Sequence, residues 1–131
     1  MIERRNPPGV HPTAGYSHIT VSTGRLAHLA GQCPLDLGGS VVGPGDHAAQ
    51  TDQVIANCLA VLAAAGAAPA DVVRSVIYVV SAESSVLSAV WRRLNDSPLG
   101  PAFTSASTLL GVAALGYEGQ LVEVDLTAAL P

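Results

Sequence analysis

The segment Val72–Val80 restricts the fold more than any other part of the chain. It reads Val-Val-Arg-Ser-Val-Ile-Tyr-Val-Val, a nearly continuous run of β-branched and aromatic residues. A run of this length and composition is typical of a strand in the middle of a sheet, with both faces covered. The rest of the chain must therefore supply neighbouring strands and a covering layer.

Two segments predict the helices of that layer. Positions 47–65 carry apolar residues at helical spacing, with Asp46 placed to cap the first turn and Gly66 placed to end the last. A second helix is expected from a serine cap at position 84 or 85 to about position 95. It would turn its leucine, valine and tryptophan side chains inward.

The remaining segments with alternating polarity predict strands. The first two form a hairpin around Gly24, a short third strand follows, and two strands close the chain. These segments are 16–22, 26–32, 40–43, 100–110 and 121–126. The order β-β-β-α-β-α-β-β predicts an α+β fold, a six-stranded mixed sheet with two helices on one face. Residues 1–131 form a single domain, in which the proline-rich residues 1–14 are an irregular arm.

The composition excludes several functions. Charged residues make up 12% of the chain, against about 25% in average proteins, so part of the surface is expected to be buried against other copies. The net charge of −4 and the lack of a basic stripe argue against nucleic-acid binding. All six basic residues are arginine, which excludes lysine Schiff-base catalysis and a P-loop. No secretion signal or membrane span is evident, so a soluble, cytoplasmic protein with reduced cysteines is expected.

The titratable residues do not form a familiar catalytic or metal-binding pattern. The four histidines are too dispersed to predict a metal site, and no Gly-x-Ser-x-Gly elbow marks a serine hydrolase. Cys33 is either an exposed thiol or, more in keeping with its type, a buried small hydrophobe. In the last strand Val122 and Val124 share one face, and Glu123 shares the other with Asp125. Such a pair of acids is usually the solvated face of a sheet.

Three local patterns, taken together, resemble the Rid/YjgF family of reactive-intermediate deaminases, often labelled L-PSP endoribonucleases. The resemblance covers the chain from about Tyr16 to Leu130. Residues 29–34, Leu-Ala-Gly-Gln-Cys-Pro, resemble the family's apolar-Ser-Gly-Gln-x-Pro segment, and 71–79 resemble its central strand. Residues 101–103 followed by 122–125 resemble its C-terminal Pro-Ala-Arg…Ile-Glu-Ile-Glu signature.

The resemblance implies a chorismate-mutase-like fold, a homotrimer with small-molecule pockets in the clefts between subunits, and no cofactor. It implies that Glu123 orients the water that attacks an imine carbon. A backbone group near Gly31 polarises the imine, and Tyr16 lines the pocket. The positions next to Gly31 and those aligned with the family's asparagine and arginine then also become candidate substrate-binding residues: Gln32, Cys33, Ser88 and Phe103.

One departure from the pattern bears on the substrate. Phe103 stands where the deaminases carry the arginine that grips the substrate carboxylate. We therefore expect an apolar wall that lacks this grip, and a Glu123 carboxylate partly desolvated by the neighbouring ring, as suits a general base. The alternatives are a hydrolase acting on an imine or enamine other than the usual 2-imino acids, and a trimeric binding module that has lost the chemistry. A ribonuclease is disfavoured by the acidic charge.

Overall fold

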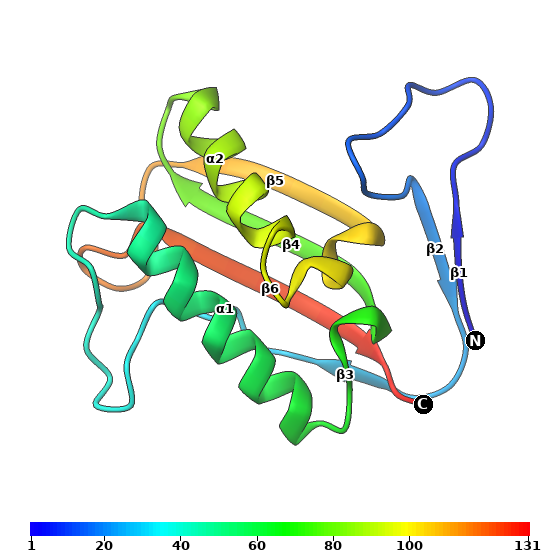
Figure 1. Ribbon diagram of the computed structural model, residues 1–131, viewed down its shortest axis with the longest axis horizontal. Helices are drawn as coiled ribbons and strands as arrows, with labels where there is room; N and C mark the ends of the chain where they lie inside the picture. The colour runs from blue at the N-terminus through cyan, green and yellow to red at the C-terminus, as the bar shows by residue number, and fades with distance from the viewer.

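Strand β4 (Val72–Val80) lies in the middle of a four-stranded sheet in the computed structural model, which describes residues 1–131. The strand order is β3-β6-β4-β5, where β3 is Leu26–His28, β6 is Val122–Ala129 and β5 is Ala106–Val112. Strand β5 is parallel to β4, whereas β6 is antiparallel to both β4 and β3, so the sheet is mixed (Figure 1). The predicted central strand is confirmed.

Helices α1 (His47–Ala64) and α2 (Ser84–Asn95) lie side by side on one face of this sheet (Figure 1). The Asp46 carboxylate accepts a hydrogen bond from the amide of Ala49 at 3.0 Å and caps α1, as predicted. Gly66 follows the helix with a φ of 79°, a conformation that glycine adopts without strain. Helix α2 begins at the expected place, but its N-cap is Glu83 and not a serine.

The core fills the space between the helices and the sheet. It is built from the inward faces of both helices and of strands β4 and β6, with Phe103 from the short 3₁₀ helix η2 (Gly100–Thr104). Its fully buried members include Val54, Cys58, Leu62, Ile77, Val79, Leu94, Val122 and Val124. The α+β class, with two helices on one face of a mixed sheet, is thus confirmed.

The six strands form two sheets, not one. Strand β1 (Ile2–Arg5) pairs antiparallel with β2 (Ile19–Ser22) in a separate two-stranded sheet. The expectation of an irregular arm is therefore wrong for residues 2–5. Tertiary contacts fix this strand: the Arg4 guanidinium donates to Ser105 Oγ at 2.9 Å and to the Ala70 carbonyl at 2.8 Å.

The predicted hairpin of 16–22 with 26–32 is also wrong. Strand β2 pairs with β1, and β3 pairs with the end of β6 instead. The turn at Gly24 has a positive φ of 91° as expected, but it passes the chain from one sheet to the other. Segment 40–43 forms only an isolated bridge between Val41 and Leu35. A second short helix, η1 (Pro69–Asp71), leads into β4.

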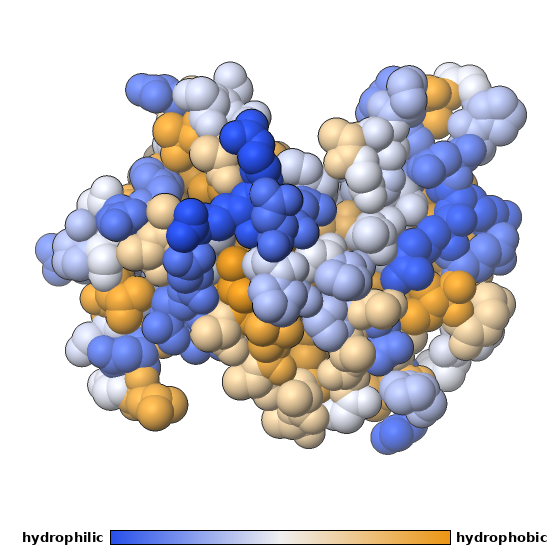
Figure 2. Space-filling model, in the orientation of Figure 1, coloured by the Kyte–Doolittle hydropathy of each residue, from blue (hydrophilic) through white to orange (hydrophobic).

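The two faces of the main sheet differ. The helices cover one face, while on the other Val76, Tyr78 and Val80 are only half-buried. On the helical side, Figure 2 shows hydrophilic residues gathered over the second half of α2 and the first turns of α1, and hydrophobic residues along the second half of α1. Neither helix has both the length and the hydropathy needed to cross a membrane.

Candidate functional site

Glu123 lies on the sheet face that the helices leave uncovered. It alternates along β6 with Val122 and Val124, which are fully buried in the core. Two side chains donate to its Oε1 atom: the Gln120 amide at 3.0 Å and the Cys33 thiol at 3.3 Å. No protein group donates to Oε2. Because no fully buried side-chain oxygen or nitrogen lacks a hydrogen-bond partner, Oε2 is at least partly exposed to solvent.

The segment after β3 brings Gly31, Gln32 and Cys33 to this carboxylate. Gln32 continues the pairing with β6 through two backbone hydrogen bonds to Val124, of 2.7 and 3.1 Å. The absence of a side chain at Gly31 is required here, because a Cβ atom would lie 2.9 Å from Glu123 Cδ and closer still to Oε2. The backbone N–H groups of Gly31 and Cys33 donate to no acceptor in the chain.

The Cys33 thiol stays protonated in this setting. Its pKa is raised to about 11, first by burial and then by the hydrogen bond to Glu123 and the charge of that carboxylate. The thiol is therefore a hydrogen-bond donor at neutral pH and a poor nucleophile. Burial also raises the pKa of Cys58 in the core, to about 12. Both cysteines are free thiols. We call the group of Gly31, Gln32, Cys33, Gln120 and Glu123 the Glu123 half-site.

An open cavity of about 390 Å³ lies beside this segment. Its lining includes Gly31, Gln32 and Cys33, together with Leu37 and Tyr117. Glu123, on β6, lies against Gly31 and Cys33 but does not line this cavity itself. Gln120 was not singled out by the sequence, because it stands in a glycine-rich loop with no periodic pattern around it. Only the folded chain shows that its amide reaches the carboxylate.

Tyr16 belongs to a second cavity, of about 370 Å³, together with Ser88 and Trp91. The tyrosine and tryptophan rings meet edge to face, with centroids 6.2 Å apart. Strand β5 contributes the floor with Ser107 and Leu109, and Ala14 completes the lining. We call these six residues the Tyr16 half-site. None of them is charged. The sequence predicted Tyr16 and Ser88 as site residues and Trp91 only as an inward-facing residue of the second helix, and it missed Ala14, Ser107 and Leu109.

Phe103 lines neither cavity. Its side chain is fully buried in the core and supports Trp91 from behind, with ring centroids 5.8 Å apart. Because it packs with Val122 and Val124, it is on the opposite side of the sheet from Glu123. The expectation that the ring lies beside the Glu123 carboxylate and desolvates it is wrong. The 3₁₀ geometry of η2 turns Phe103 inward under α2.

The two half-sites do not meet within one chain. The Glu123 half-site lies at the β3–β6 edge of the sheet, and the Tyr16 half-site at the β5 edge. The Tyr16 half-site includes two β5 side chains from the sheet face that carries the helices, Ser107 and Leu109. Glu123 points to the opposite, uncovered face of the sheet. The chain thus brings Glu123 together with Gly31, Gln32 and Cys33, and brings Tyr16 together with Ser88.

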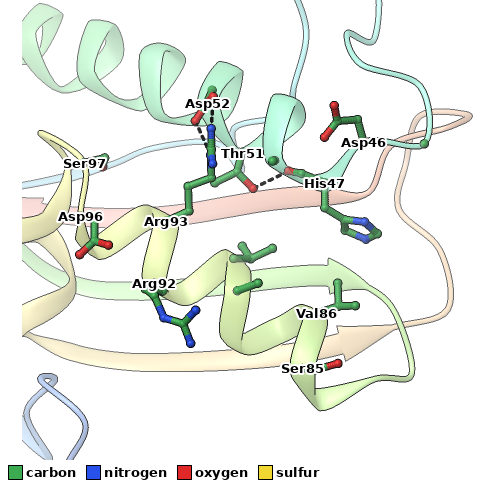
Figure 3. A pocket seen from close by; sticks show the side chains of 14 residues that line it. Asp46, His47, Thr51, Asp52, Ser85, Val86, Arg92, Arg93, Asp96 and Ser97 are labelled. Atoms are coloured by element: carbon green, nitrogen blue, oxygen red, sulfur yellow. Dashed lines mark hydrogen bonds and ion pairs between the residues drawn. The ribbon is translucent and has the colours of Figure 1, made fainter.

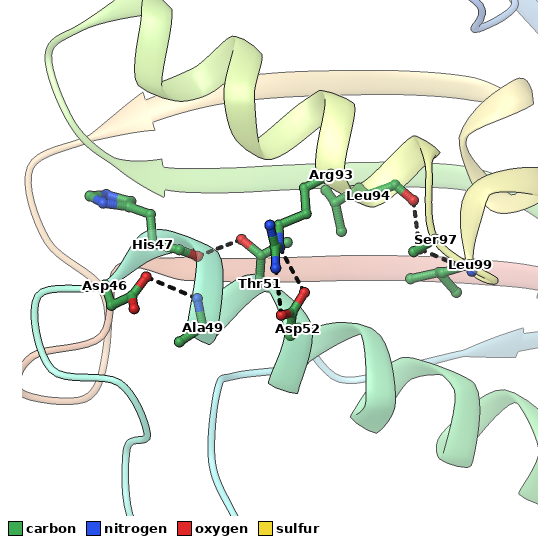
Figure 4. A network of polar contacts seen from close by, with 9 residues as sticks. All are labelled: Asp46, His47, Ala49, Thr51, Asp52, Arg93, Leu94, Ser97 and Leu99. Carbon is green, nitrogen blue, oxygen red and sulfur yellow. Dashed lines mark hydrogen bonds and ion pairs between the residues drawn. The ribbon is translucent and has the colours of Figure 1, made fainter.

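A third cleft, of about 1090 Å³, runs between α1 and α2 (Figure 3). Two polar contacts join residues that line it. The Arg93 guanidinium donates twice to the Asp52 carboxylate at 2.7 Å, which lowers the pKa of Asp52 (Figure 4). Thr51 donates to the carbonyl of His47, whose ring contacts the carbonyl of Val80 at 3.0 Å. The pair of Arg93 and Asp52 links α2 to α1, and no predicted site residue lines this cleft.

No group of three histidine, cysteine, aspartate or glutamate side chains is placed to hold a metal ion. His11 and His18 do approach each other, with ring centroids 4.8 Å apart. His11 hydrogen-bonds the Tyr16 hydroxyl at 3.1 Å, and His18 bonds the His11 carbonyl at 2.8 Å. These contacts fix the loop that carries Tyr16.

Comparison with known proteins gives a consistent picture. The family model for endoribonuclease L-PSP matches residues 7–130. The crystal structure of YyfB from Yersinia pestis, described as a protein of unknown function of the conserved Rid family, is 36% identical, with a TM-score of 0.85 over 98% of each chain. YyfA from the same organism, described in the same way, is 31% identical, with a TM-score of 0.69 over 91% of this chain and 90% of that one. The yeast protein YEO7, at 24% identity and a TM-score of 0.70 over the whole of both chains, shares the fold. No curated protein matches.

Proposed function

Because the chain belongs to the Rid, or endoribonuclease L-PSP, family, we propose that it is a cofactor-free hydrolase acting on a small imine or enamine. Glu123 is the residue that we assign to the chemistry, as the carboxylate that orients and activates a water. One observation supports this assignment most directly. Oε1 of Glu123 accepts two hydrogen bonds, whereas Oε2 accepts none and is at least partly exposed to solvent beside Gly31.

The proposed reaction is hydrolysis of a C=N bond. Glu123 takes a proton from the water as the water oxygen bonds to the imine carbon, and the π electrons move to the nitrogen, which takes that proton back from the Glu123 carboxyl. Glu123 then moves the hydroxyl proton of the adduct to the nitrogen, the C–N bond breaks, and the carbonyl compound and ammonia are released. The N–H groups of Gly31 and Cys33, which have no acceptor in the chain, are the donors that we assign to the developing charge.

The proposed substrate is neutral and carries a flat apolar group. Tyr16 and Trp91 offer aromatic surfaces, and Ser88 and Ser107 offer hydroxyls, but no arginine lines either half-site. A charge-assisted bond from arginine to a carboxylate contributes about 1.5–3 kcal/mol, or roughly a tenfold to hundredfold gain in affinity. A 2-imino acid would lack that contribution here, as we inferred from Phe103, although Phe103 itself supports Trp91 and does not touch the cavity.

We propose that the working unit is a homotrimer in which the Glu123 half-site of one copy meets the Tyr16 half-site of the next. The placement of the two half-sites at opposite edges of the sheet supports this arrangement, because one chain cannot close both over a single small molecule. The half-buried apolar residues of the uncovered sheet face support it too. Light scattering should give three times the chain mass of 13.2 kDa, and a monomer would contradict the arrangement.

The test of the reaction is ammonia release from a panel of neutral and carboxylate-bearing imines. Wild type should turn over neutral imines best, and Glu123→Gln should abolish turnover. Asp125→Asn is the matched control, because Asp125 lies on the same strand face two residues away and has no contact with Cys33 or Gln120. If Glu123→Gln equals wild type on every substrate, the proposal is wrong.

The second candidate is a trimeric small-molecule-binding module without turnover. The uncharged lining of the Tyr16 half-site favours it, because such a cavity binds without supplying a charge to stabilise a transition state. A ligand would then raise the unfolding temperature by mass action while no ammonia appears. We do not propose the ribonuclease activity in the family's description, because the net charge is −4 and no arginine lines either half-site.

A further inference from the structure

Gln120 is a buried amide that joins the β5–β6 loop to Glu123. Its side chain is 3% exposed and makes three hydrogen bonds. Oε1 accepts from the backbone N–H of Tyr117 at 3.1 Å, and Nε2 donates to the Val122 carbonyl at 3.2 Å and to Glu123 Oε1 at 3.0 Å. A backbone N–H can only donate and a carbonyl can only accept, so these contacts fix which end of the amide faces Glu123.

A second buried glutamine fixes the same loop from the helical layer. Gln50 of α1 is fully buried, and its Oε1 accepts from the Leu121 N–H at 2.7 Å. Its Nε2 donates to the carbonyls of Gly119 at 3.0 Å and Gly43 at 3.3 Å. The backbone is thus tied down immediately before and immediately after Gln120. The amide that meets Glu123 is therefore mounted on a rigid support, although it belongs to a loop.

Cys33 binds the same carboxylate oxygen from another segment, the one that follows β3 and pairs with β6 at Gln32. Its thiol donates to Glu123 Oε1 at 3.3 Å, and a pKa of about 11 keeps the proton on sulfur at neutral pH. Two donors from two separate segments therefore converge on Oε1, while Oε2 has none. A carboxylate held at one oxygen by two donors cannot rotate freely, so its other oxygen points in one direction.

Building on the proposed function, we propose that Gln120 and Cys33 are positioning residues for Glu123. They bind Oε1 so that Oε2 alone, beside the side-chain-free Gly31, is presented to the attacking water. Neither residue needs to touch the substrate through its side chain. Loss of either donor frees the carboxylate to rotate, and misplacement of a catalytic group by about 1 Å can cost about a hundredfold in rate.

The kinetic test uses variants that remove or keep a donor. Gln120→Met keeps the length of the side chain but removes the amide, and should lower kcat about tenfold to a hundredfold while KM changes less than about twofold. Cys33→Ala should lower kcat in the same way, and Cys33→Ser, which keeps a donor, should recover most of it. Arg93→Met is the control, since Arg93 lies in the cleft between α1 and α2, lines neither half-site and bonds only Asp52. Equal kcat in wild type, Gln120→Met and Cys33→Ala would overturn the inference.

A second measurement tests the contact without using activity. The pKa of the Cys33 thiol is obtained from the pH dependence of its alkylation by iodoacetamide, with the modified peptide identified by mass spectrometry. In Glu123→Gln the pKa should fall from about 11 toward the ordinary 9.0, because the charge of Glu123 and its hydrogen bond both raise it. An unchanged pKa would overturn the inference even if Gln120→Met fails to fold.

The two measurements separate the inference from the function on which it rests. If wild type releases no ammonia from any imine but the thiol pKa falls in Glu123→Gln, the hydrolase is refuted and the contact stands as a fixed carboxylate in a binding site. If wild type is active, Glu123→Gln is inactive, and Gln120→Met keeps the wild-type kcat, the hydrolase stands and the positioning role is refuted.

Discussion

Replacement of Gly31 by alanine probes the Glu123 half-site through one methyl group. An added Cβ would lie 2.9 Å from Glu123 Cδ and 3.2 Å from Cγ, both shorter than ordinary van der Waals contact. Gly31 is not among the glycines with a positive φ, so its backbone conformation is open to alanine. The substitution therefore acts through Glu123, which must move away from Gln120 and Cys33.

The cost follows from the two hydrogen bonds that the displaced carboxylate gives up. A hydrogen bond to a charged group contributes about 1.5–3 kcal/mol, but Glu123 is half-buried and water replaces part of the loss. We expect Gly31→Ala to reduce the free energy of unfolding by about 2 kcal/mol, which for a chain of this size lowers the unfolding temperature by roughly 6–8 °C. The rate of imine hydrolysis should fall about a hundredfold.

A double-mutant cycle with Glu123→Ala isolates the clash. The three atoms nearest to the added Cβ all belong to the Glu123 side chain, so Glu123→Ala removes these close contacts. Gly31→Ala should then be neutral or stabilising by about 0.4–1 kcal/mol, because alanine lowers the conformational entropy of the unfolded chain. The coupling energy, measured by denaturant unfolding at one fixed protein concentration, should thus be about 2–3 kcal/mol. Gly116→Ala is the matched control, because no atom lies within 4 Å of its added Cβ. Equal costs of Gly31→Ala with and without the Glu123 side chain would refute the reasoning.

Two further substitutions test the helical layer. Gln50→Met should lower the free energy of unfolding by about 3 kcal/mol, chiefly because the part-buried N–H of Leu121 loses its acceptor, whereas Gln53→Met on the same helix should cost under about 1 kcal/mol in denaturant unfolding. Arg93→Met should remove the stabilising contact between Arg93 and Asp52, whose contribution to the free energy of unfolding depends on pH. The guanidinium lowers the pKa of Asp52, so the pair stabilises the fold above the ordinary carboxyl pKa of 3.8 and loses that contribution as the pH falls through the lowered value. The free energy of unfolding of wild type should therefore exceed that of Arg93→Met at neutral pH, and this difference should shrink as the pH falls below about 4. A difference that stays constant from neutral to strongly acidic pH would contradict it.

The elements that local pattern determines are the ones that the sequence predicted. The run Val72–Val80 becomes the central strand, and both helices follow their apolar spacing. The errors fall where distant contacts decide. Residues 2–5 carry three charges and show no strand pattern, yet Arg4 reaches Ser105, about a hundred residues away, and fixes β1. The expected hairpin did not form because each of its strands pairs with a segment outside it, β2 with β1 and β3 with the end of β6.

The site was predictable only as far as its residues belong to short motifs. Gly31 and Glu123 stand in segments that resemble family signatures, and the fold places them in contact. Gln120 and Ser107 carry no such mark, because their importance comes from what they face after folding. The predicted position of Phe103, beside Glu123, was wrong for a related reason. Strand alternation tells which residues share a face, but η2 is not a strand, and its turn directs the ring into the core.

The separation of the two half-sites leads to a quantitative prediction for mixed oligomers. Glu123→Gln disables one half-site, and Ser88→Trp fills the other from an exposed position on α2, so each variant alone should be inactive. If each cleft takes one half-site from each of two copies, random mixing of the variants in equal amounts leaves about one quarter of the clefts with both halves intact. Co-expression should therefore restore roughly a quarter of the wild-type rate of ammonia release. Mixed oligomers, verified by two different tags, that remain inactive would show that the half-sites do not meet across subunits.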